Sequence, residues 1–319
     1  MQNLRKYGSP PFDIALIHGG PGAPGEMAPV ARELSFSPYP HPDHYAYPDH
    51  YDNQGHYTNQ DHYDNPGYYD NPENSANPGY YAYPDRAADS FEPPISGRGV
   101  LEPLQTAVTL DGQVRELKAV LKEHAALPVT LIGFSWGAML SYIFTASHPE
   151  FVKKLILVGS GPYEEKYADI IRRTRGSRLC KVERKETYSR IPTLNDLSNG
   201  NKNASFAGFG QLMSLADSYD PLPHEDEVLE YQYMINKNVW GDASKLRSNG
   251  KLLKLGKKIR CPVIAIHGDY DPHPFEGVRD PLSGVLKNFR YVLLEKCGHR
   301  PWIEREARER FYDVLKGEI

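Results

Sequence analysis

The sequence predicts an α/β fold in which helices flank a mostly parallel β-sheet. Short apolar runs rich in β-branched residues recur along the chain, bounded by glycine, proline or polar residues, which is typical of buried strands. Helical segments separate these runs, as expected where crossover connections join parallel strands. The runs span residues 13–17, 99–103, 127–132, 152–159, 263–268 and 291–294.

The strand at residues 13–17 leads directly into the loop His18-Gly19-Gly20-Pro21-Gly22, and residues 27–34 are predicted to form a helix after it. Glycine lets the backbone approach a ligand closely and adopt positive φ. Backbone N–H groups aimed at a carbonyl oxygen stabilise the negative charge that acyl transfer places there, by ~3 kcal/mol each. We expect the N–H of Gly20 to be one such donor, with Gly19 as the alternative. An ordinary Gly/Pro turn is the competing interpretation.

Residues 36–98 form a low-complexity insertion before the next strand. Residues 36–85 contain 11 of the 22 tyrosines and 5 of the 12 histidines, but no Lys, Arg, Leu, Ile, Val or Met. The cause is a six-residue repeat, in which tyrosine recurs at Tyr45, Tyr51, Tyr57, Tyr63 and Tyr69. Such a segment buries too little apolar surface to offset its ordering entropy, so we expect it to be disordered and to leave the sheet at the edge opposite the site. An expanded repeat without function, a tract for weak protein interactions and a weak metal-binding tract remain open.

The strand at residues 127–132 is followed by Gly133-Phe134-Ser135-Trp136-Gly137 and then by an apolar helix over residues 138–146. Strand, glycine-flanked serine and helix together are the context of a nucleophile elbow. The sharp turn exposes the serine hydroxyl at a helix N-terminus, where the dipole favours negative charge. We expect the N–H of Trp136 to be the second donor to the carbonyl oxygen. An amphipathic helix over residues 114–126 precedes this strand.

Two polar groups that a serine nucleophile needs follow the last two strands. Asp269 and Asp271 lie in the loop after residues 263–268, and His299 lies in the loop after residues 291–294. A neutral imidazole can accept the serine proton, and a carboxylate fixes its tautomer. The carboxyl ends of parallel strands meet at one sheet edge, so we expect Ser135, Asp271 and His299 to form a catalytic triad. Asp269 follows the strand too closely to reach His299 and is expected to bind local backbone.

Residues 162–258 lack the strand pattern and contain polar helical segments around residues 163–186, 206–218 and 227–246. They are predicted to form a helical region between the strands at residues 152–159 and 263–268. Tyr231 and Trp240 are candidate pocket residues, together with Tyr233 and Phe209. A helix over residues 301–316 closes the chain.

The HGGPG, GFSWG, HGDYD and CGH motifs together resemble the α/β-hydrolase superfamily, and within it the HGGPG-bearing branch typified by proline iminopeptidases. The resemblance implies a core of residues 1–35, 99–161 and 259–319, with residues 162–258 inserted as a helical cap after the strand that follows the elbow helix. Such a cap is expected to exclude water from the site and to shape the substrate pocket. Two features depart from this branch. Few residues precede the first strand, so the leading antiparallel strands are expected to be short or missing. Phe134 stands where the peptidases tend to have a second small residue.

The leading hypothesis is a serine hydrolase that cleaves an ester or amide of a small substrate through an acyl-enzyme on Ser135. A carboxylesterase needs only an apolar acyl pocket. A prolyl-type aminopeptidase acting on short peptides needs carboxylates for the free amine, and the candidates are Glu164, Glu165, Glu225, Glu227 and Glu230. A ligand-binding protein with a retained but slow triad is the third possibility. Relatives that cleave haloalkanes or epoxides are disfavoured, because they use Asp where this chain has Ser135.

Composition narrows the partners and cellular locations that this protein is expected to have. The formal net charge of −4 argues against general nucleic-acid binding. Three scattered cysteines, Cys180, Cys261 and Cys297, favour a reducing compartment over a disulfide framework. We find neither an apolar run of membrane-spanning length nor a secretory signal, and we therefore expect a cytoplasmic protein that does not bind membranes. No cofactor or metal is expected at the catalytic site.

Overall fold

The computed structural model describes residues 3–36, 98–179, 202–225 and 227–319. The insertion predicted for residues 36–98 therefore lies outside the described residues, apart from Phe36 and Arg98 at its two ends. Its disorder and its interactions remain predictions. The end of the helical segment predicted for residues 163–186 also lies outside them, beyond Leu179.

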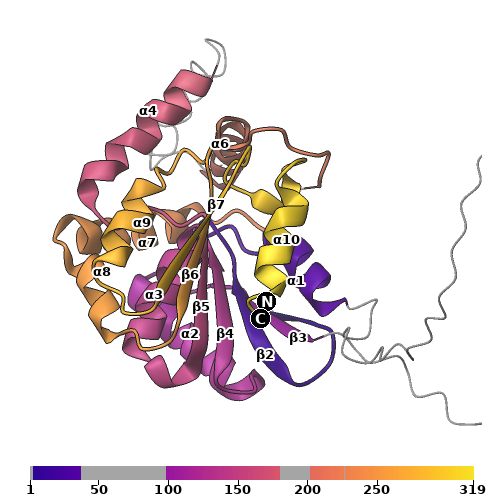
Figure 1. The fold of residues 1–319 in the computed structure, drawn as a ribbon. Helices are drawn as coiled ribbons and strands as arrows, with labels where there is room; N and C mark the ends of the chain where they lie inside the picture. The colour runs from indigo at the N-terminus through magenta and orange to yellow at the C-terminus, as the bar shows by residue number, and fades with distance from the viewer. Residues whose placement is uncertain (1–2, 37–97, 180–201, 226) are drawn as a thin grey trace, which may run out of the picture. The chain divides into compact units, whose positions relative to one another are not determined.

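The described residues form a seven-stranded sheet in the order β1-β3-β2-β4-β5-β6-β7 (Figure 1). Every neighbouring pair is parallel except β1 and β3, which are antiparallel. The strands are β1 (Leu4–Tyr7), β2 (Phe12–Ile17), β3 (Gly99–Pro103), β4 (Val129–Phe134), β5 (Val152–Val158), β6 (Val263–Gly268) and β7 (Phe289–Leu294). The predicted α/β fold is confirmed. The leading antiparallel part of the sheet is present as the four residues of β1.

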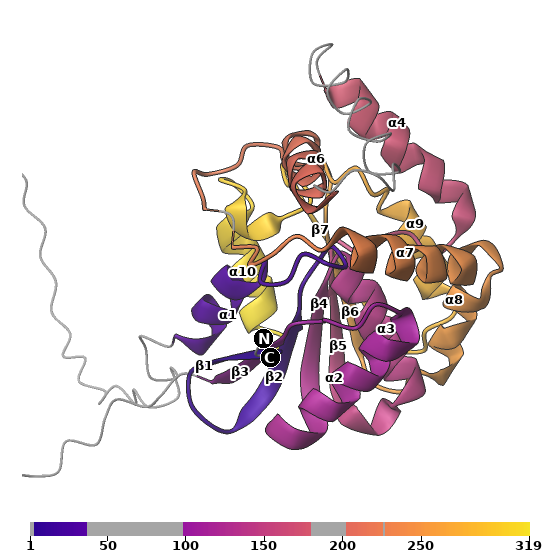
Figure 2. The ribbon, with the colours of Figure 1, turned by 180° about the vertical axis from the view of Figure 1, so that it is seen from behind.

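Side chains alternate between two apolar layers along the central strands, as the period of two in a strand requires. Ala15, Ile17 and Leu131 belong to one core cluster, which the helices α2 (Leu110–His124), α3 (Trp136–Ser147) and α9 (Glu276–Ser283) cover. Ile14, Leu16 and Ile132 belong to the other, which α1 (Ala28–Ser35) and α10 (Arg308–Lys316) cover. Figures 1 and 2 show these two helix layers on opposite faces of the sheet. The sheet is thus buried on both faces, which explains its continuous apolar strands.

Between β5 and β6 the described residues form helices and no strand of the sheet. They include α4 (Ala168–Arg178), α6 (Lys202–Asp217), α7 (Tyr233–Ser248) and α8 (Lys251–Lys254), and α6 lies beyond the end of the sheet in both views (Figures 1 and 2). The helix predicted for residues 227–246 begins only at Tyr233. Before it, the N–H groups of Leu229 and Gln232 donate to the carbonyl oxygens of Pro24 and Gly22, at 2.9 and 2.7 Å. These bonds hold residues 229–232 against the loop after β2, so their backbone is not available for a helix.

Two further helix boundaries differ from the prediction. The helix predicted from residue 114 begins at Leu110, because the Thr109 hydroxyl accepts the N–H of Gly112 and caps the first turn. The helix predicted over residues 301–316 is divided into a 3₁₀ turn, Pro301–Ile303, and α10. Between them the backbone at Glu304 forms an isolated β-bridge with Pro221, and the N–H of Arg305 donates to the carbonyl oxygen of Asp220 instead of a helical partner. The buried carboxylate of Glu304 also accepts N–H groups of Tyr219, Asp220 and Gly298. No helix in the described part of the chain has the length and apolar character needed to cross a membrane.

Candidate active site

Ser135 lies between the last residue of β4 and the first residue of α3, in a strained conformation. Its φ of 53° and ψ of −113° are rare for a residue with a side chain. A Cβ atom added to Gly133 would come within 2.2 Å of the carbonyl oxygen of Gly137. One added to Gly137 would come equally close to the carbonyl oxygen of Ile17. The two glycines of the motif are therefore required for the turn that presents the serine.

Three of the predicted site residues form one chain of hydrogen bonds. His299 Nδ1 lies 2.7 Å from Asp271 Oδ2, and His299 Nε2 lies 3.0 Å from Ser135 Oγ. An ionised carboxylate only accepts, so Nδ1 must donate to it, and Nε2 is left to accept the serine hydroxyl proton. This is the tautomer that a general base acting on Ser135 requires.

The electrostatics of the pair His299–Asp271 support the same protonation states. Burial alone would raise the pKa of Asp271, but the neighbouring histidines, His299 first, outweigh it and hold this pKa well below its ordinary value. Burial alone would lower the pKa of His299, but the charge of Asp271 and the hydrogen bond to it outweigh burial and raise this pKa. Asp271 is therefore ionised beside an imidazole made more basic by its presence.

Asp269 lies outside this chain. Its Oδ1 accepts the N–H of Cys297 at 3.1 Å, and its own N–H donates to the carbonyl oxygen of Leu294. It joins the loop after β6 to the loop after β7. This is the local backbone role that the sequence predicts for it.

Two histidines that the sequence analysis did not single out also surround Asp271. His273 Nδ1 lies 2.8 Å from Asp271 Oδ1, and His267 Nε2 lies 3.4 Å from Oδ2. Both are buried. The signal was present in the run His267-Gly268-Asp269-Tyr270-Asp271-Pro272-His273, where a histidine stands two residues after the aspartate.

The loop after β2 borders the site and is held by its own contacts. His18 Nδ1 lies 2.6 Å from the carbonyl oxygen of Gly19, and His18 Nε2 lies 3.3 Å from the N–H of Gln105, so the ring donates to one and accepts from the other. Burial lowers the pKa of His18 to about 4, which keeps the ring neutral for this pair of bonds. Arg5, which pairs with the buried Glu102, donates to the carbonyl oxygen of Gly25 at 2.8 Å.

Gly20 has a φ of +31° and lines the same cavity as Ser135. The N–H of Trp136 is the first of α3, where an N–H has no partner inside the helix. Gly20 therefore borders the cavity over Ser135, whereas Trp136 directly follows Ser135 in the chain but is not among the described residues that line the cavity. Gly19 packs tightly against Glu26 and Phe134, and it is not among the described residues that line this cavity.

A cavity of about 380 Å³ opens over Ser135 and His299. Tyr231 and Trp240 line it, as predicted for the pocket, and so does Phe209. Its other aromatic and polar lining residues include Phe206, Arg175, Asp217, Glu26, His273 and Arg300. Arg175 donates two hydrogen bonds to Asp217, at 2.7 and 2.6 Å, and the Asp217 carbonyl accepts the N–H of His299. This pair ties α4 and α6 to the histidine loop.

The five glutamates proposed to bind a free amine do not line this cavity in the described structure. Glu164, Glu165 and Glu227 pair with Lys166, Arg247 and Arg32, and Glu230 accepts from Gln232. The acidic residues that do line it are Glu26 and Asp217. Glu26 lies just after the glycine-rich loop, a position that the sequence analysis did not consider.

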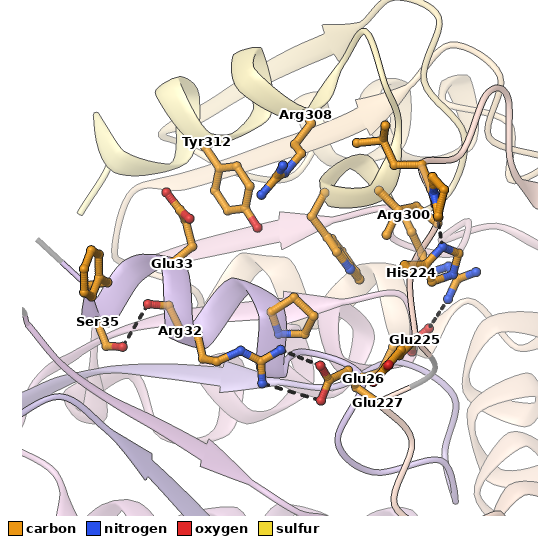
Figure 3. Close-up of a pocket in the computed structure, with 16 residues that line it drawn as sticks. Glu26, Arg32, Glu33, Ser35, His224, Glu225, Glu227, Arg300, Arg308 and Tyr312 are labelled. Carbon is orange, nitrogen blue, oxygen red and sulfur yellow. Dashed lines mark hydrogen bonds and ion pairs between the residues drawn. The ribbon is translucent and has the colours of Figure 1, made fainter. Parts of the chain in front are cut away.

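A second hollow, of about 640 Å³, adjoins the first and is called the outer groove here (Figure 3). It shares Glu26, His224 and Arg300 with the cavity and extends past Arg32 and Glu227 to Tyr312. Figure 3 shows the Arg32 guanidinium directed at the Glu227 carboxylate.

Asp271, His273 and His299 also have the donor types of a metal site, and their donor atoms lie within 4.8 Å of one another. In this structure both Nδ1 atoms are hydrogen-bonded to the carboxylate. The geometry is that of one carboxylate shared by two imidazoles.

Comparison with known proteins agrees with this architecture. Residues 63–306, more than half of the 319, match the model of a family described as alpha/beta hydrolase fold. A protein of Bacillus subtilis (strain 168), assigned as a 2-succinyl-6-hydroxy-2,4-cyclohexadiene-1-carboxylate synthase, is 25% identical over 198 residues, which cover 60% of this chain and 67% of that protein. Proline iminopeptidase of Lactobacillus delbrueckii subsp. bulgaricus is 24% identical over 212 residues, covering 64% of this chain and 70% of that protein.

Solved structures share the fold at low sequence identity. The crystal structure of VinJ has a TM-score of 0.54 and 15% identity, covering 100% of this chain and 97% of that chain. Proline iminopeptidase of Mycobacterium smegmatis has a TM-score of 0.51 and 14% identity, covering 98% and 92%. The family match, the seven-stranded sheet and the serine at the turn after β4 lead to one conclusion: the chain belongs to the alpha/beta hydrolase fold family.

Proposed function

We propose that this protein is a serine hydrolase that cleaves an ester or amide of a small substrate through an acyl-enzyme on Ser135. One observation carries the proposal. The serine hydroxyl, at a strained turn on the floor of a cavity, is hydrogen-bonded to an imidazole that is hydrogen-bonded to a buried carboxylate.

Each group has a role in this proposal. His299 takes the proton of Ser135 as the hydroxyl oxygen attacks the substrate carbonyl, and Asp271 stabilises the imidazolium that forms. The N–H groups of Gly20 and Trp136 bind the oxyanion of the tetrahedral intermediate. His299 then gives its proton to the leaving group. A water molecule, deprotonated by His299, releases the acyl group in the second half of the reaction.

The cavity supports a small substrate. Its volume of about 380 Å³ lies toward the lower end of the range for ligand pockets. The helices α4, α6 and α7 contribute residues to its lining, and we propose that they act as a cap over the acyl-enzyme. Apolar and aromatic walls favour an apolar group on the substrate.

An aminopeptidase is the second candidate, and Glu26 is the observation that favours it. Glu26 lines the cavity that holds Ser135, and its Oε1 lies 4.0 Å from Arg300 Nη1; in this candidate the same carboxylate binds the free N-terminal amine. The two proline iminopeptidases among the relatives agree with this candidate but do not separate it from an esterase, because both activities use the same triad.

Steady-state hydrolysis of p-nitrophenyl esters with two to eight acyl carbons, beside prolyl and alanyl arylamides, separates the candidates. An esterase turns over the short esters well above the Ser135→Ala variant. An aminopeptidase hydrolyses the arylamides, and its Glu26→Gln variant loses this activity. If wild-type rates on every substrate equal those of Ser135→Ala, the hydrolase proposal is wrong and a ligand-binding protein is favoured.

A further inference from the structure

Asp271 is shared by two imidazole rings, of which the proposed reaction uses one. His299 Nδ1 bonds to Oδ2, whereas His273 Nδ1 bonds to Oδ1 at 2.8 Å. The backbone N–H of His273 also donates to Oδ1, at 2.9 Å. The two ring centroids lie 4.5 Å apart with their planes inclined by 31°. A second histidine therefore stands beside the first in a fixed orientation.

The protonation state of His273 follows from these bonds. The carboxylate only accepts, so Nδ1 carries the proton, and Nε2 is a bare acceptor. Burial lowers the pKa of His273 to about 4, so the ring is neutral near pH 7. His267 Nε2 lies 2.9 Å from the carbonyl oxygen of His273, to which it must donate, and this bond fixes the backbone that carries the ring.

His273 lines the cavity, so we expect its second ring nitrogen, which Asp271 does not use, to face that cavity. In an imidazole, Nδ1 and Nε2 flank Cε1 and point in different directions, so a ring that bonds a carboxylate through Nδ1 directs Nε2 away from it. In His299, which is bonded to the same carboxylate, Nε2 reaches Ser135 in the cavity. His273 lines that cavity, and no described residue makes a hydrogen bond to its Nε2.

An oriented acceptor at this place has a clear chemical preference. It accepts from a hydroxyl, an amine or an amide N–H and offers nothing to a methyl group of the same size. A site that is built to hydrogen-bond a substrate donor discriminates strongly against the analogue that lacks it. The remaining walls, which include Phe206, Tyr231 and Trp240, suit the apolar part of such a substrate.

We propose that His273 determines specificity by accepting, at Nε2, a hydrogen bond from a donor group on the substrate. The inference rests on the proposed hydrolase function and names its substrate class: small esters or amides that carry a hydroxyl or N–H group. Because the rings of His273 and His299 are 4.5 Å apart, this donor lies within a few bonds of the carbonyl carbon that Ser135 attacks.

Matched esters test the inference. Methyl butyrate is compared with its 2-hydroxy and 3-hydroxy derivatives, and propyl butyrate with 2-hydroxyethyl butyrate, so that donors on both sides of the scissile bond are sampled. In the wild type, kcat/KM for at least one hydroxylated ester should exceed that of its partner by about tenfold or more.

Three variants separate substrate recognition from the support that His273 gives to Asp271. In His273→Asn, the side-chain amide can still donate to Asp271 Oδ1 but offers no Nε2, so the preference should fall to about one. His273→Phe loses both contacts and should lose rate on every ester as well. His224→Asn changes another histidine of the same cavity and should keep the preference.

The ratio of the two esters distinguishes the outcomes. A purely structural role for His273 would lower both rates together and leave the ratio unchanged in His273→Asn, which would overturn the inference. Turnover of methyl butyrate by the wild type without preference for any hydroxylated ester would also overturn it, while the proposed function would stand. If the wild type hydrolysed neither these esters nor the p-nitrophenyl esters and arylamides, the proposed function would fail, and this inference with it.

Discussion

The cavity over Ser135 and the outer groove share three lining residues, yet they use their polar groups in different ways. In the groove, charges pair with one another: Arg32 with Glu227, and Lys316 with Glu33. The cavity also has an ion pair in its lining, Arg175 with Asp217. Its reacting groups differ, because their hydrogen bonds run in one direction, from Ser135 through His299 to Asp271.

The groove is the larger hollow, at about 640 Å³ against about 380 Å³. Its ion pairs are partly exposed to solvent, and such pairs contribute little to stability. Behind the cavity lies the carboxylate of Asp271, whose side chain is 0% exposed and which accepts hydrogen bonds from the Nδ1 atoms of His299 and His273. The comparison teaches that neither volume nor number of charges identifies a reactive site. A reactive site is identified by polar groups whose orientation and protonation states are fixed.

Ser135→Ala should give the largest effect. The cavity would lose its nucleophile and keep its shape, so kcat should fall by roughly 10⁴- to 10⁶-fold. Thermal unfolding should be nearly unchanged, because the hydroxyl packs against little. Activity within tenfold of the wild type would place the nucleophile elsewhere.

Asp271→Asn should give the second-largest effect. We expect a loss of about four decades in kcat on the best ester, because the amide no longer fixes the tautomer of His299. Asp269→Asn is the matched control two residues away. It keeps an oxygen that can accept the N–H of Cys297, so its rate should fall by less than about tenfold. The reverse ranking would mean that Asp269 serves His299 during the reaction.

The pH profile should show an intermediate effect. The protein must have His299 neutral to accept the proton, and Asp271 raises the pKa of His299 above its ordinary value of 6.5. As the pH falls below that raised pKa, kcat/KM should decline about tenfold per unit. The midpoint should lie above 6.5 in the wild type and move down in Asp271→Asn, which lacks the charge. A midpoint below 6, or an upward move in the variant, would contradict this electrostatic account.

Glu227→Gln, in the outer groove, should give the smallest effect. It breaks the pair with Arg32 on the surface, so the free energy of unfolding should change by less than about 1 kcal/mol. We expect kcat/KM to stay within about threefold for esters and arylamides. A selective loss on prolyl arylamide would show instead that Glu227 binds the amine and that the groove belongs to the site.

Local motifs explain why much of this could be predicted. Each strand carries its own apolar run, and the nucleophile elbow is specified by Gly133 and Gly137, which allow one tight turn. The meeting of Ser135, Asp271 and His299 follows from parallel strands, whose carboxyl ends share an edge.

Contacts between distant segments explain what the sequence did not predict. The sequence places His273 two residues after Asp271, but it is the turn between them that brings the imidazole back onto the same carboxylate. The start of α7 depends on bonds from residues 229–232 to Gly22 and Pro24, some 200 positions earlier. The five glutamates were chosen by type and region alone, but the direction of a side chain decides whether it reaches a cavity.

Labelling with a fluorophosphonate probe, followed by peptide mass spectrometry, tests the central claim most directly. The probe reacts with a serine that a neighbouring base activates and requires no knowledge of the substrate. We predict one modified residue, Ser135, in the wild type, much slower labelling in Asp271→Asn, and none at this peptide in Ser135→Ala. Stoichiometric modification of a different residue, or no modification of wild-type Ser135, would contradict the claim that the hydrogen-bonded chain activates it.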